Sequence, residues 1–350
     1  MFRTAMTQAH KPNHFLTLKT LPPATILSLV HRSLAFKHAH PHTPPASNTN
    51  MLHGKTLALL FTKKSTRTRI SAETAWSSLG GHPMFLGSND IQLGDPAKGG
   101  ESWRDTATVV GSMVDAVFAR LGDHKEIEEL AQYSRAPVIN ALTAKYHPMQ
   151  ALADIMTIYE ATLGERVLKE IVSSGEDLPR LEGVKVAWVG DANNIINSLL
   201  VSLPRLGIHV SVATPAGYEI DADIKEFVAV EGARAKNVAG DTYGTVSYTT
   251  DPSVACNGAH IIVTDTWVSM GQEADKESKL KDFAGYKVTE AMAKLGNAHP
   301  DWKFMHCLPR KLEEVDDEVF YNPDRSLVFS EAENRKWTAI AVFEHVMGGK

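Results

Sequence analysis

Cysteine is nearly absent from this sequence of 350 residues, which contains only Cys256 and Cys307. Two cysteines cannot supply a disulfide framework for a chain of this length, and such sparse use fits a reducing compartment. Uninterrupted apolar runs of about 18 residues are also missing, so we expect no transmembrane helix. The composition has 43% hydrophobic and 22% charged residues. These proportions are typical of a soluble globular protein, and the length allows two domains.

Acidic residues are missing from the first part of the chain, where Glu73 is the first carboxylate. Residues 1–72 carry ten Lys and Arg and seven His. The other 278 residues carry the remaining 26 basic groups against all 41 acidic groups. The amino-terminal part therefore suits an anionic ligand. A nucleic-acid partner is the competing interpretation, but the net charge of −5 and the pI near 6.3 argue against it.

The usual nucleotide and metal fingerprints are missing as well. The turn at 190–194 reads Gly-Asp-Ala-Asn-Asn and has no second or third glycine to admit a pyrophosphate. No Walker A sequence is present either, so we expect neither a nicotinamide or flavin cofactor nor ATP chemistry. The His-rich stretch at 38–42 could bind metal, but its proline-rich surroundings indicate a surface loop. We therefore expect no organic cofactor and no metal.

A basic corner is the first feature that indicates a function. The segment from Phe61 to Arg69 reads Phe-Thr-Lys-Lys-Ser-Thr-Arg-Thr-Arg and follows an apolar run at 57–60. Ser65 is a good N-cap for the helix expected next, and the first turn of a helix offers free N–H groups and partial positive charge. Together with the guanidinium group of Arg67, this arrangement predicts an oxyanion site. The alternative is a capped surface helix with solvated charges.

Short β-rich runs alternate with helical stretches, which predicts an α/β fold of two domains, each a parallel β-sheet flanked by helices. We expect strands at 55–61, 115–120 and 137–140 in one sheet and at 185–190, 209–213, 260–265, 302–307 and 326–329 in the other. Residues 103, 106, 110, 113 and 117 follow a helical spacing. A helix that begins at Pro148, with His147 as its cap, is expected to join the two domains. Residues 173–183, rich in Ser, Gly, Glu and Pro, indicate a surface insertion.

Unusual polar clusters lie at the ends of the predicted strands or at the start of the connecting helix. They are Ser65–Arg69, Arg120, His147 with Gln150, Asp191–Asn194, Asp265–Gly271 and His306–Arg310. Ligands of open α/β sheets bind beyond the carboxyl ends of the strands. Chance could place one cluster there, but six are hard to attribute to chance. The clusters are therefore predicted to converge on a ligand site.

Four motifs identify a family that this chain resembles. They are Ser-Thr-Arg-Thr-Arg at 65–69, His-Pro-x-Gln at 147–150, Asp-x-Trp-x-Ser-Met-Gly at 265–271 and His-Cys-Leu-Pro-Arg at 306–310. Together they resemble ornithine carbamoyltransferase, and the resemblance runs from about residue 13 to the end. The first two motifs belong to carbamoyltransferases generally, whereas the other two indicate the ornithine enzyme. The resemblance implies transfer of the carbamoyl group from carbamoyl phosphate to the δ-amino group of L-ornithine, which gives L-citrulline and phosphate in arginine biosynthesis.

The resemblance also implies which residues bind carbamoyl phosphate. They are Ser65, Thr66, Arg67, Thr68, Gln92, Arg120, His147, Gln150, Cys307, Leu308 and Arg335. The basic corner and Arg335 would hold the phosphate. Thr68, Arg120 and His147 would surround the carbamoyl oxygen, where negative charge grows as the amine attacks. Gln150 and the main chain at 307–308 would hold the carbamoyl NH2 group.

For ornithine the implied ligands are Asn194, Asp265, Ser269 and Met270, with Asp265 as the anchor of the α-amino group. Cys307 would assist removal of a proton from the δ-amino group or orient that group. The implied catalytic residues are Arg67, Arg120, His147, Asp265 and Cys307. Plainer roles stay open, because Cys307 could be a small buried apolar residue, Asp265 a helix cap and His147 only a cap. For Cys256, core packing is the first choice.

The family is a homotrimer with active sites between subunits, which implies that Gln92 reaches the phosphate site of a neighbour. The sequence departs from the family pattern at 94–104. The implied domains are residues 1–148 for carbamoyl phosphate and 149–334 for ornithine, with a C-terminal helix at about 335–350 packing back on the first. Neither nucleic acid nor membrane is an expected partner.

The mitochondrial matrix is the expected compartment, with the cytoplasm as the alternative, because relatives occur in both. The first fourteen residues, which include Arg3 and Lys11 and no acid, are compatible with the remnant of a targeting segment. Two rival functions stay open. One is carbamoylation of another acceptor, such as aspartate, putrescine or an N-acylated ornithine, and the other is a catalytically silent binding or regulatory protein on the same fold.

Overall fold

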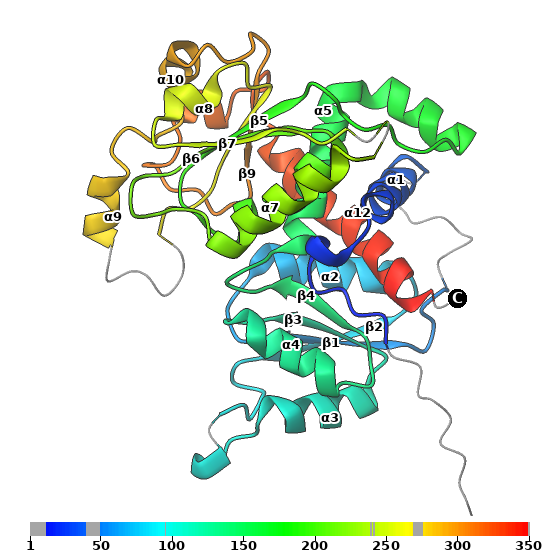
Figure 1. Ribbon diagram of the computed structural model, residues 1–350. Coiled ribbons are helices and arrows are strands. Elements are labelled where there is room, and N and C mark those ends of the chain that lie inside the picture. Colours follow the sequence, from blue (N-terminus) through cyan, green and yellow to red (C-terminus); the bar gives the residue numbers. More distant parts are fainter. Residues whose placement is uncertain are drawn as a thin grey trace, which may run out of the picture.

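The computed structural model describes residues 12–39, 50–94, 96–238, 240, 242–268 and 276–348. In this part of the chain two parallel β-sheets lie one above the other, each flanked by helices (Figure 1). Long helices run between the two sheets. The predicted α/β fold with two parallel-sheet domains is therefore confirmed.

The first sheet has the strand order β2-β1-β3-β4, and all its neighbouring strands are parallel. Its strands are β1 (Thr56–Phe61), β2 (His82–Gly87), β3 (Ala116–Arg120) and β4 (Val138–Leu142). The helices around it are α2 (Thr66–Ser78) on one face and α3 (Trp103–Met113) and α4 (His124–Tyr133) on the other (Figure 1). Every residue of β3 and nearly every residue of β1 is buried, as expected for central strands covered on both faces.

The second sheet has the order β7-β6-β5-β8-β9 and is also parallel throughout. Its strands are β5 (Lys185–Val189), β6 (His209–Ala213), β7 (Val246–Thr249), β8 (Ile261–Thr264) and β9 (Lys303–His306). Its helices are α6 (Asn194–Leu200), α7 (Ala222–Ala235), α8 (Pro252–Cys256), α9 (Lys276–Asp282), α10 (Glu290–Leu295) and α11 (Asp317–Phe320). Short 3-10 turns occur at η1 (Leu18–Thr20), η2 (Pro96–Lys98) and η3 (Leu203–Leu206).

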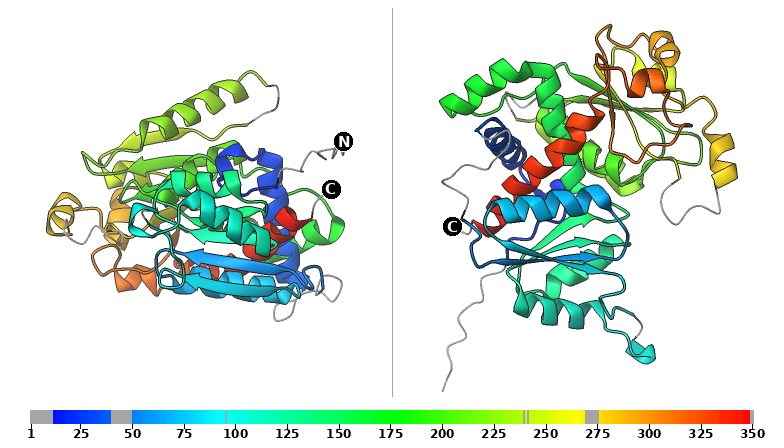
Figure 2. Two further views of the ribbon diagram at one scale, coloured as in Figure 1. Left: turned by 90° about the horizontal axis from the view of Figure 1, so that it is seen from below. Right: turned by 180° about the vertical axis from the view of Figure 1, so that it is seen from behind.

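Three long helices link the sheets: α1 (Pro23–Ala39), α5 (Pro148–Ser174) and α12 (Val328–Met347). Helix α12 packs against α1, α2 and α5 and also reaches β9, so it runs from the second sheet to the first (Figure 2). Near its end Phe343 makes edge-on ring contacts with Trp76 and Phe118, at centroid distances of 5.0 and 5.8 Å. These aromatic contacts fix α12 against the first sheet.

Three expectations about the elements were wrong. Residues 326–329 are not a strand, because only Ser326 makes a single bridge, to Phe304, and the chain enters α12 at Val328. That helix also begins before the expected start near residue 335. The helical spacing of 103–117 breaks at Met113, and Val117 belongs to β3.

The segment at 173–183 lies mostly at the surface, as expected, but two of its leucines are buried. Helix α5 ends at Ser174, with Gly175 in the left-handed conformation at its C-cap. Beyond that point Leu178 and Leu181 are buried, and the Tyr159 hydroxyl donates to the main-chain carbonyl of Pro179 at 2.7 Å. The segment is therefore anchored in the core around α5 by its leucines.

Cys256 is fully buried in the core of the second sheet, as expected. No helix in the described part of the chain is both long and apolar enough to cross a bilayer. Of the His-rich stretch, His40 and His42 lie outside the described residues, whereas His38 lies in the last turn of α1.

Candidate active site

The basic corner is formed by the turn from β1 into α2. Ser65 occupies the N-cap position of α2, but its side chain makes no capping hydrogen bond. Its hydroxyl is therefore available to a ligand at the free N–H groups of the first turn. Arg67 points from this turn toward the second sheet and donates from Nη2 to the carbonyl of Leu308. Its Nε is buried without a hydrogen-bond partner in the described chain.

Arg69 in the same motif points elsewhere. Its guanidinium stacks over the ring of Phe85 at 3.8 Å from the centroid and pairs with Glu73 at 2.9 Å. Thr66, the first residue of α2, is exposed beside the turn. The two arginines of the corner are thus separated by the helical geometry, and only Arg67 faces the interior of the molecule.

Arg120 ends β3 and lies opposite Phe61 of β1 in the sheet register. Its carbonyl accepts from the main-chain N–H of Thr62 at 3.0 Å, which holds the strand end beside the corner. The side chain is buried, and its Nε has no partner in the described chain. Burial, together with the nearby charge of Arg67, lowers the pKa of Arg120 to about 10.

Arg335 of α12 brings a third guanidinium to the same place. It donates from Nη2 to the hydroxyl of Thr68 and from Nη1 to Oε1 of Gln150, both at 2.9 Å. Burial lowers its pKa to about 10, and the charges of Arg67 and Arg120 contribute to that shift. The charge of Arg67 thus lowers the pKa of both Arg120 and Arg335. The three guanidinium groups form a site of concentrated positive charge, which an anion would neutralise.

His147 lies between these arginines and the second sheet. It is at the N-cap of α5, but its side chain makes no capping bond. Its main-chain N–H donates to the hydroxyl of Ser198 at 2.8 Å, while its Nδ1 is buried without a partner in the described chain. Burial and the charges of Arg335 and Arg120 hold the pKa of His147 well below its usual value. The imidazole is therefore neutral at neutral pH.

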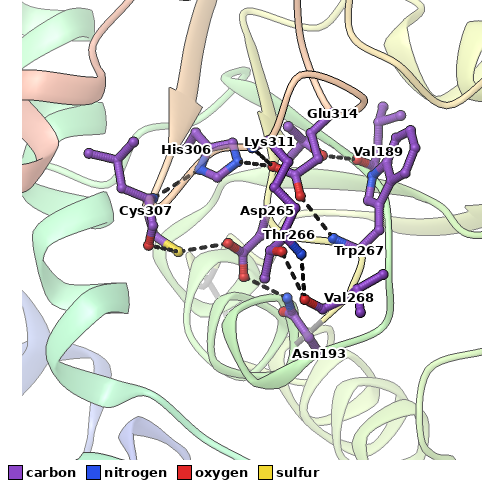
Figure 3. Close-up of polar contacts among 12 residues, drawn as sticks. Val189, Asn193, Asp265, Thr266, Trp267, Val268, His306, Cys307, Lys311 and Glu314 are labelled. Atoms are coloured by element: carbon purple, nitrogen blue, oxygen red, sulfur yellow. Dashed lines mark hydrogen bonds and ion pairs between the residues drawn. The ribbon is translucent and has the colours of Figure 1, made fainter. Parts of the chain in front are cut away.

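The second sheet contributes a carboxylate–thiol pair beyond the ends of β8 and β9 (Figure 3). The Cys307 thiol donates to Oδ1 of Asp265 at 2.9 Å. The side-chain amide of Asn193 donates to Oδ2 of the same carboxylate at 2.7 Å. Burial raises the pKa of Asp265, and burial with the adjacent carboxylate raises that of Cys307 well above its usual value. The thiol is therefore protonated at neutral pH.

The turn that carries Cys307 is shaped by its own histidine. His306 Nδ1 accepts from the N–H of Leu308 at 2.9 Å, so Nε2 carries the proton and donates to Glu314 at 3.1 Å (Figure 3). Leu308 adopts a positive φ of 60°, and its carbonyl accepts from Arg67. This bond joins the basic corner of one sheet to the thiol turn of the other.

Several sequence-predicted residues thus come together, and others do not. The hydrogen bonds and charge interactions described above link Arg67, Thr68, Arg120, His147, Gln150, Asp265, Cys307, Leu308 and Arg335. Ser65 and Thr66 lie at the corner. Asn194 donates its amide to the carbonyl of Thr143 at 2.7 Å, and it is the neighbouring Asn193 that holds Asp265. Ser269 and Met270 lie outside the described residues.

Gln92 lies apart from this cluster. It is an exposed residue after β2, and its carbonyl accepts from the N–H of Glu101 at 2.7 Å. The segment around η2 that follows it extends away from the sheet at the lower edge of the molecule (Figure 1). In this chain Gln92 is therefore not part of the assembled cluster.

Sequence reasoning missed three acidic partners of the cluster. Gln150 donates from Nε2 to Asp154 at 2.8 Å and to Glu331 at 2.9 Å, and Glu314 holds His306. A signal was present for two of them, because Asp154 follows Gln150 and Glu331 precedes Arg335 by one helical turn of four residues. Glu314 carried no comparable signal.

Nothing in the described chain groups three or more His, Cys, Asp or Glu side chains as a metal site. A hollow of about 1030 Å³ lies along α7 and β7, and its lining contains none of the predicted site residues. The cluster itself offers three guanidinium groups, a neutral imidazole, a buried carboxylate and a protonated thiol. These groups suit two substrates that meet at the site, one with a multiply charged anionic group and the other with an amine that acts as acceptor.

Two family models match the chain. Residues 13–160 match the carbamoyl-P binding domain of aspartate/ornithine carbamoyltransferase, and residues 182–346 match the Asp/Orn binding domain. The chain is 48% identical over 342 residues to mitochondrial ornithine carbamoyltransferase of Aspergillus terreus, which covers 97% of this chain and 90% of that protein. The corresponding protein of Coccidioides immitis is 47% identical, with 95% and 92% covered.

Solved structures give the same result. A crystal structure of mitochondrial ornithine carbamoyltransferase from Coccidioides immitis matches with a TM-score of 0.83 and 44% identity, covering 97% of this chain and 98% of that chain. The ornithine carbamoyltransferase structure from Pyrococcus furiosus has a TM-score of 0.83 and 39% identity, with 98% and 100% covered.

Proposed function

The chain belongs to the aspartate/ornithine carbamoyltransferase family, and from this we infer that it transfers the carbamoyl group of carbamoyl phosphate to the δ-amino group of L-ornithine. The products are L-citrulline and phosphate, and the reaction is a step of arginine biosynthesis. The bond from Arg67 to the carbonyl of Leu308 carries the proposal, because it joins the basic corner of the first sheet to the thiol turn of the second. Both substrates can then meet at one junction.

The basic corner is proposed to hold the phosphate. Ser65, Thr66 and the free N–H groups of the first turn of α2 surround the anion, and Arg67 supplies a guanidinium. Arg335 completes the anion pocket, while its bond to Thr68 fixes that side chain. The lowered pKa values of Arg120 and Arg335 support this assignment, because a phosphate dianion would relieve the repulsion among the cations.

The carbamoyl oxygen is proposed to lie between Arg120 and His147, with Thr68 close by. As the amine attacks, negative charge grows on this oxygen, and donors fixed beforehand stabilise it without reorganising. A neutral His147 serves as a donor without adding a further cation. The carbamoyl NH2 group is proposed to bind to Gln150 and to the main chain of the 307–308 turn. Because both substrates are held in line, much of the rate enhancement comes from positioning.

Ornithine is proposed to place its α-amino group at Asp265, the carboxylate whose pKa is raised by burial. Asn194, Ser269 and Met270 are proposed for the amino-acid end of ornithine. Cys307 lies at the δ-amino group, and its protonated thiol orients the amine and Asp265 more readily than it removes a proton. No metal or organic cofactor enters this chemistry.

The division into domains is proposed to follow the sheets. Residues 1–148 form the carbamoyl phosphate domain, residues 149–334 form the ornithine domain, and the C-terminal helix packs back on the first. The contacts of α12 with α1 and α2 support the placement of the C-terminal helix. The two family models, at residues 13–160 and 182–346, support a division between the sheets. The fungal relatives are named mitochondrial proteins, so we assign this chain to mitochondria, with the matrix as the expected compartment. A homotrimer with sites between subunits is proposed for the assembly.

A product assay tests the proposed function. Carbamoyl phosphate with L-ornithine should yield citrulline, whereas L-aspartate, putrescine and N-acetyl-L-ornithine should give little product. Arg67→Ala should lower kcat by about 100- to 1000-fold, the usual cost of losing one such donor. Arg69→Ala is the matched control, because Arg69 lies on the surface with Phe85 and Glu73, and it should retain near-normal turnover. Activity on another amine without activity on L-ornithine would overturn the proposal.

A further inference from the structure

A buried polar network lies behind the proposed carbamoyl phosphate site, where two long helices pack against each other (Figure 1). Gln150 and Asp154 are one turn apart on α5, and Glu331 and Arg335 are one turn apart on α12. Their exposed fractions are 1% for each of the first three and 5% for Arg335. Every polar atom of this network must therefore be satisfied inside the protein.

The donors of the network fix the orientation of the Gln150 amide. Arg335 has only donors, so the atom that faces its Nη1 at 2.9 Å must be the amide oxygen. The amide nitrogen then points at the acids and donates to Oδ1 of Asp154 at 2.8 Å and to Oε1 of Glu331 at 2.9 Å. The other oxygen of Glu331, Oε2, accepts from the main-chain N–H of His306 at 2.9 Å.

Three of the four carboxylate oxygens thus have an N–H donor. The fourth, Oδ2 of Asp154, is buried and has no N–H or O–H donor in the described chain. One nitrogen, Nε2 of Gln150, donates to both acids, so the two carboxyl groups lie side by side in the buried site. A proton on the unpartnered Oδ2 gives that atom a hydrogen bond to make and removes one of two adjacent negative charges.

The charges around the pair agree with a retained proton. Burial raises the pKa of Asp154 to about 7 and that of Glu331 well above its usual value. Arg335 is the cation that faces the pair, whereas Asp265 and the Cys307 thiol face it from the second sheet. A second full negative charge would be repelled by Asp265, which acts on both acids.

We propose that Asp154 and Glu331 share one proton, carried on Oδ2 of Asp154 toward Glu331, and that the pair is a positioning device for carbamoyl phosphate. Through Gln150 it aims an amide oxygen at Arg335, and through the N–H of His306 it holds the strand end that carries the thiol turn. The pair touches neither substrate. This inference rests on the proposed function, because Gln150 and Arg335 are the groups through which it acts.

Two isosteric substitutions with the same change of charge separate the roles of the acids. In Asp154→Asn the new NH2 group replaces the proposed hydroxyl toward Glu331, and the new carbonyl still accepts from Gln150. The KM for carbamoyl phosphate should stay within threefold of that of the unmodified chain. In Glu331→Gln an NH2 group must face the N–H of Gln150 or His306. That KM should rise at least tenfold, with a smaller change in the KM for ornithine.

An infrared difference spectrum of the unmodified chain against Asp154→Asn gives an independent readout. The carbonyl stretch of a buried protonated carboxylic acid should be present in the former and lost in the latter. Absence of that band overturns the proposal, as does equal impairment by the two substitutions or impairment by Asp154→Asn alone. If Glu331→Gln does not fold, Asp154→Asn and the spectrum still decide.

The failure of this inference is distinguishable from failure of the proposed function. Citrulline formation by the unmodified chain tests the function by itself. The infrared band and the difference between the two variants in binding carbamoyl phosphate, measured by calorimetry without any acceptor amine, test the shared proton. An active enzyme with no such band would retain the proposed function and exclude the shared proton.

Discussion

Cys307 donates its thiol hydrogen to a carboxylate that is itself buried, and this pairing decides what the side chain can do. Burial and the adjacent Asp265 keep the pKa of the thiol well above its usual value. A thiol that stays protonated through the neutral range is a donor, and it is a poor base for the δ-ammonium group of ornithine. The structure therefore favours orientation over proton removal, two roles that the sequence left open.

This distinction leads to a residue-scale prediction. Cys307→Ser keeps a hydroxyl donor toward Asp265, so kcat/KM for ornithine should fall by less than about tenfold. Cys307→Ala leaves one oxygen of a buried carboxylate unpaired, so kcat/KM should fall by about 10- to 100-fold, as for a hydrogen bond to a charged group. Steady-state kinetics over a range of ornithine concentrations measures both values.

The dependence of activity on pH tests whether Cys307 acts as a donor or as a base. A titrating thiol would add an ionisation to the profile of the unmodified chain that is missing from the Cys307→Ser profile. Superimposable profiles are expected, because the thiol remains protonated in this range. An ionisation that disappears with the thiol would show that Cys307 acts as a base.

At the scale of elements, the sequence predicted strands by their burial. Strands β1, β3, β5 and β8 are short apolar runs in the interior of a sheet, and β9 is an edge strand that is nevertheless mostly buried. The bounds of each were expected to within one or two residues. Strands β2 and β7 are edge strands with mixed polar and half-buried residues, so their sequences lack the apolar run. Tertiary packing of the edge supplies what the local pattern lacks.

The candidate site follows the same rule. The motif residues could be predicted because strand ends collect ligand groups, and most of them meet in the structure. Their partners could not be predicted in the same way. Asn193 was indistinguishable from Asn194 in a turn, and only the direction of the α6 N-cap decides that Asn193 reaches Asp265. Glu314 meets His306 through a loop that the sequence pattern does not specify.

One buried ion pair connects elements around the proposed ornithine site. Lys279 of α9 donates to Oδ2 of Asp191 at 2.8 Å and to the carbonyl of Trp267 at 2.9 Å. Asp191 belongs to the turn that carries Asn193, and Trp267 follows Asp265 by two residues. The ammonium group therefore ties the ends of two strands to the helix after the 265–271 motif.

Lys279→Met should therefore act on ornithine in preference to carbamoyl phosphate. Loss of the ammonium leaves the Asp191 carboxylate buried without its cation, which costs about 3 kcal/mol in the free energy of unfolding. The KM for ornithine should rise while that for carbamoyl phosphate changes little. The double variant Lys279→Met with Asp191→Asn is the control, and it should recover part of the lost stability in denaturant unfolding. Equal increases in both KM values would contradict a local role.

At the scale of the whole molecule, the first sheet exposes apolar groups on an edge strand and on α3. Met84 of β2 is 42% exposed, and Val109 and Met113 of α3 are 47% and 75% exposed. Exposed apolar groups on one domain are compatible with a subunit interface. Gln92 follows the same edge strand and is exposed. These observations support the proposed homotrimer with shared sites.

Mixed oligomers test whether Gln92 serves a neighbouring site. Arg67→Ala and Gln92→Ala subunits should each be weakly active alone, because every site lacks one of the two groups. If the groups of one site come from different subunits, random mixing at equal amounts gives about a quarter of the sites both native groups. Refolding or subunit exchange should then restore about a quarter of the native turnover. Light scattering establishes whether the mixture is trimeric, and a trimer that regains no activity would show that Gln92 does not complete a neighbour's site.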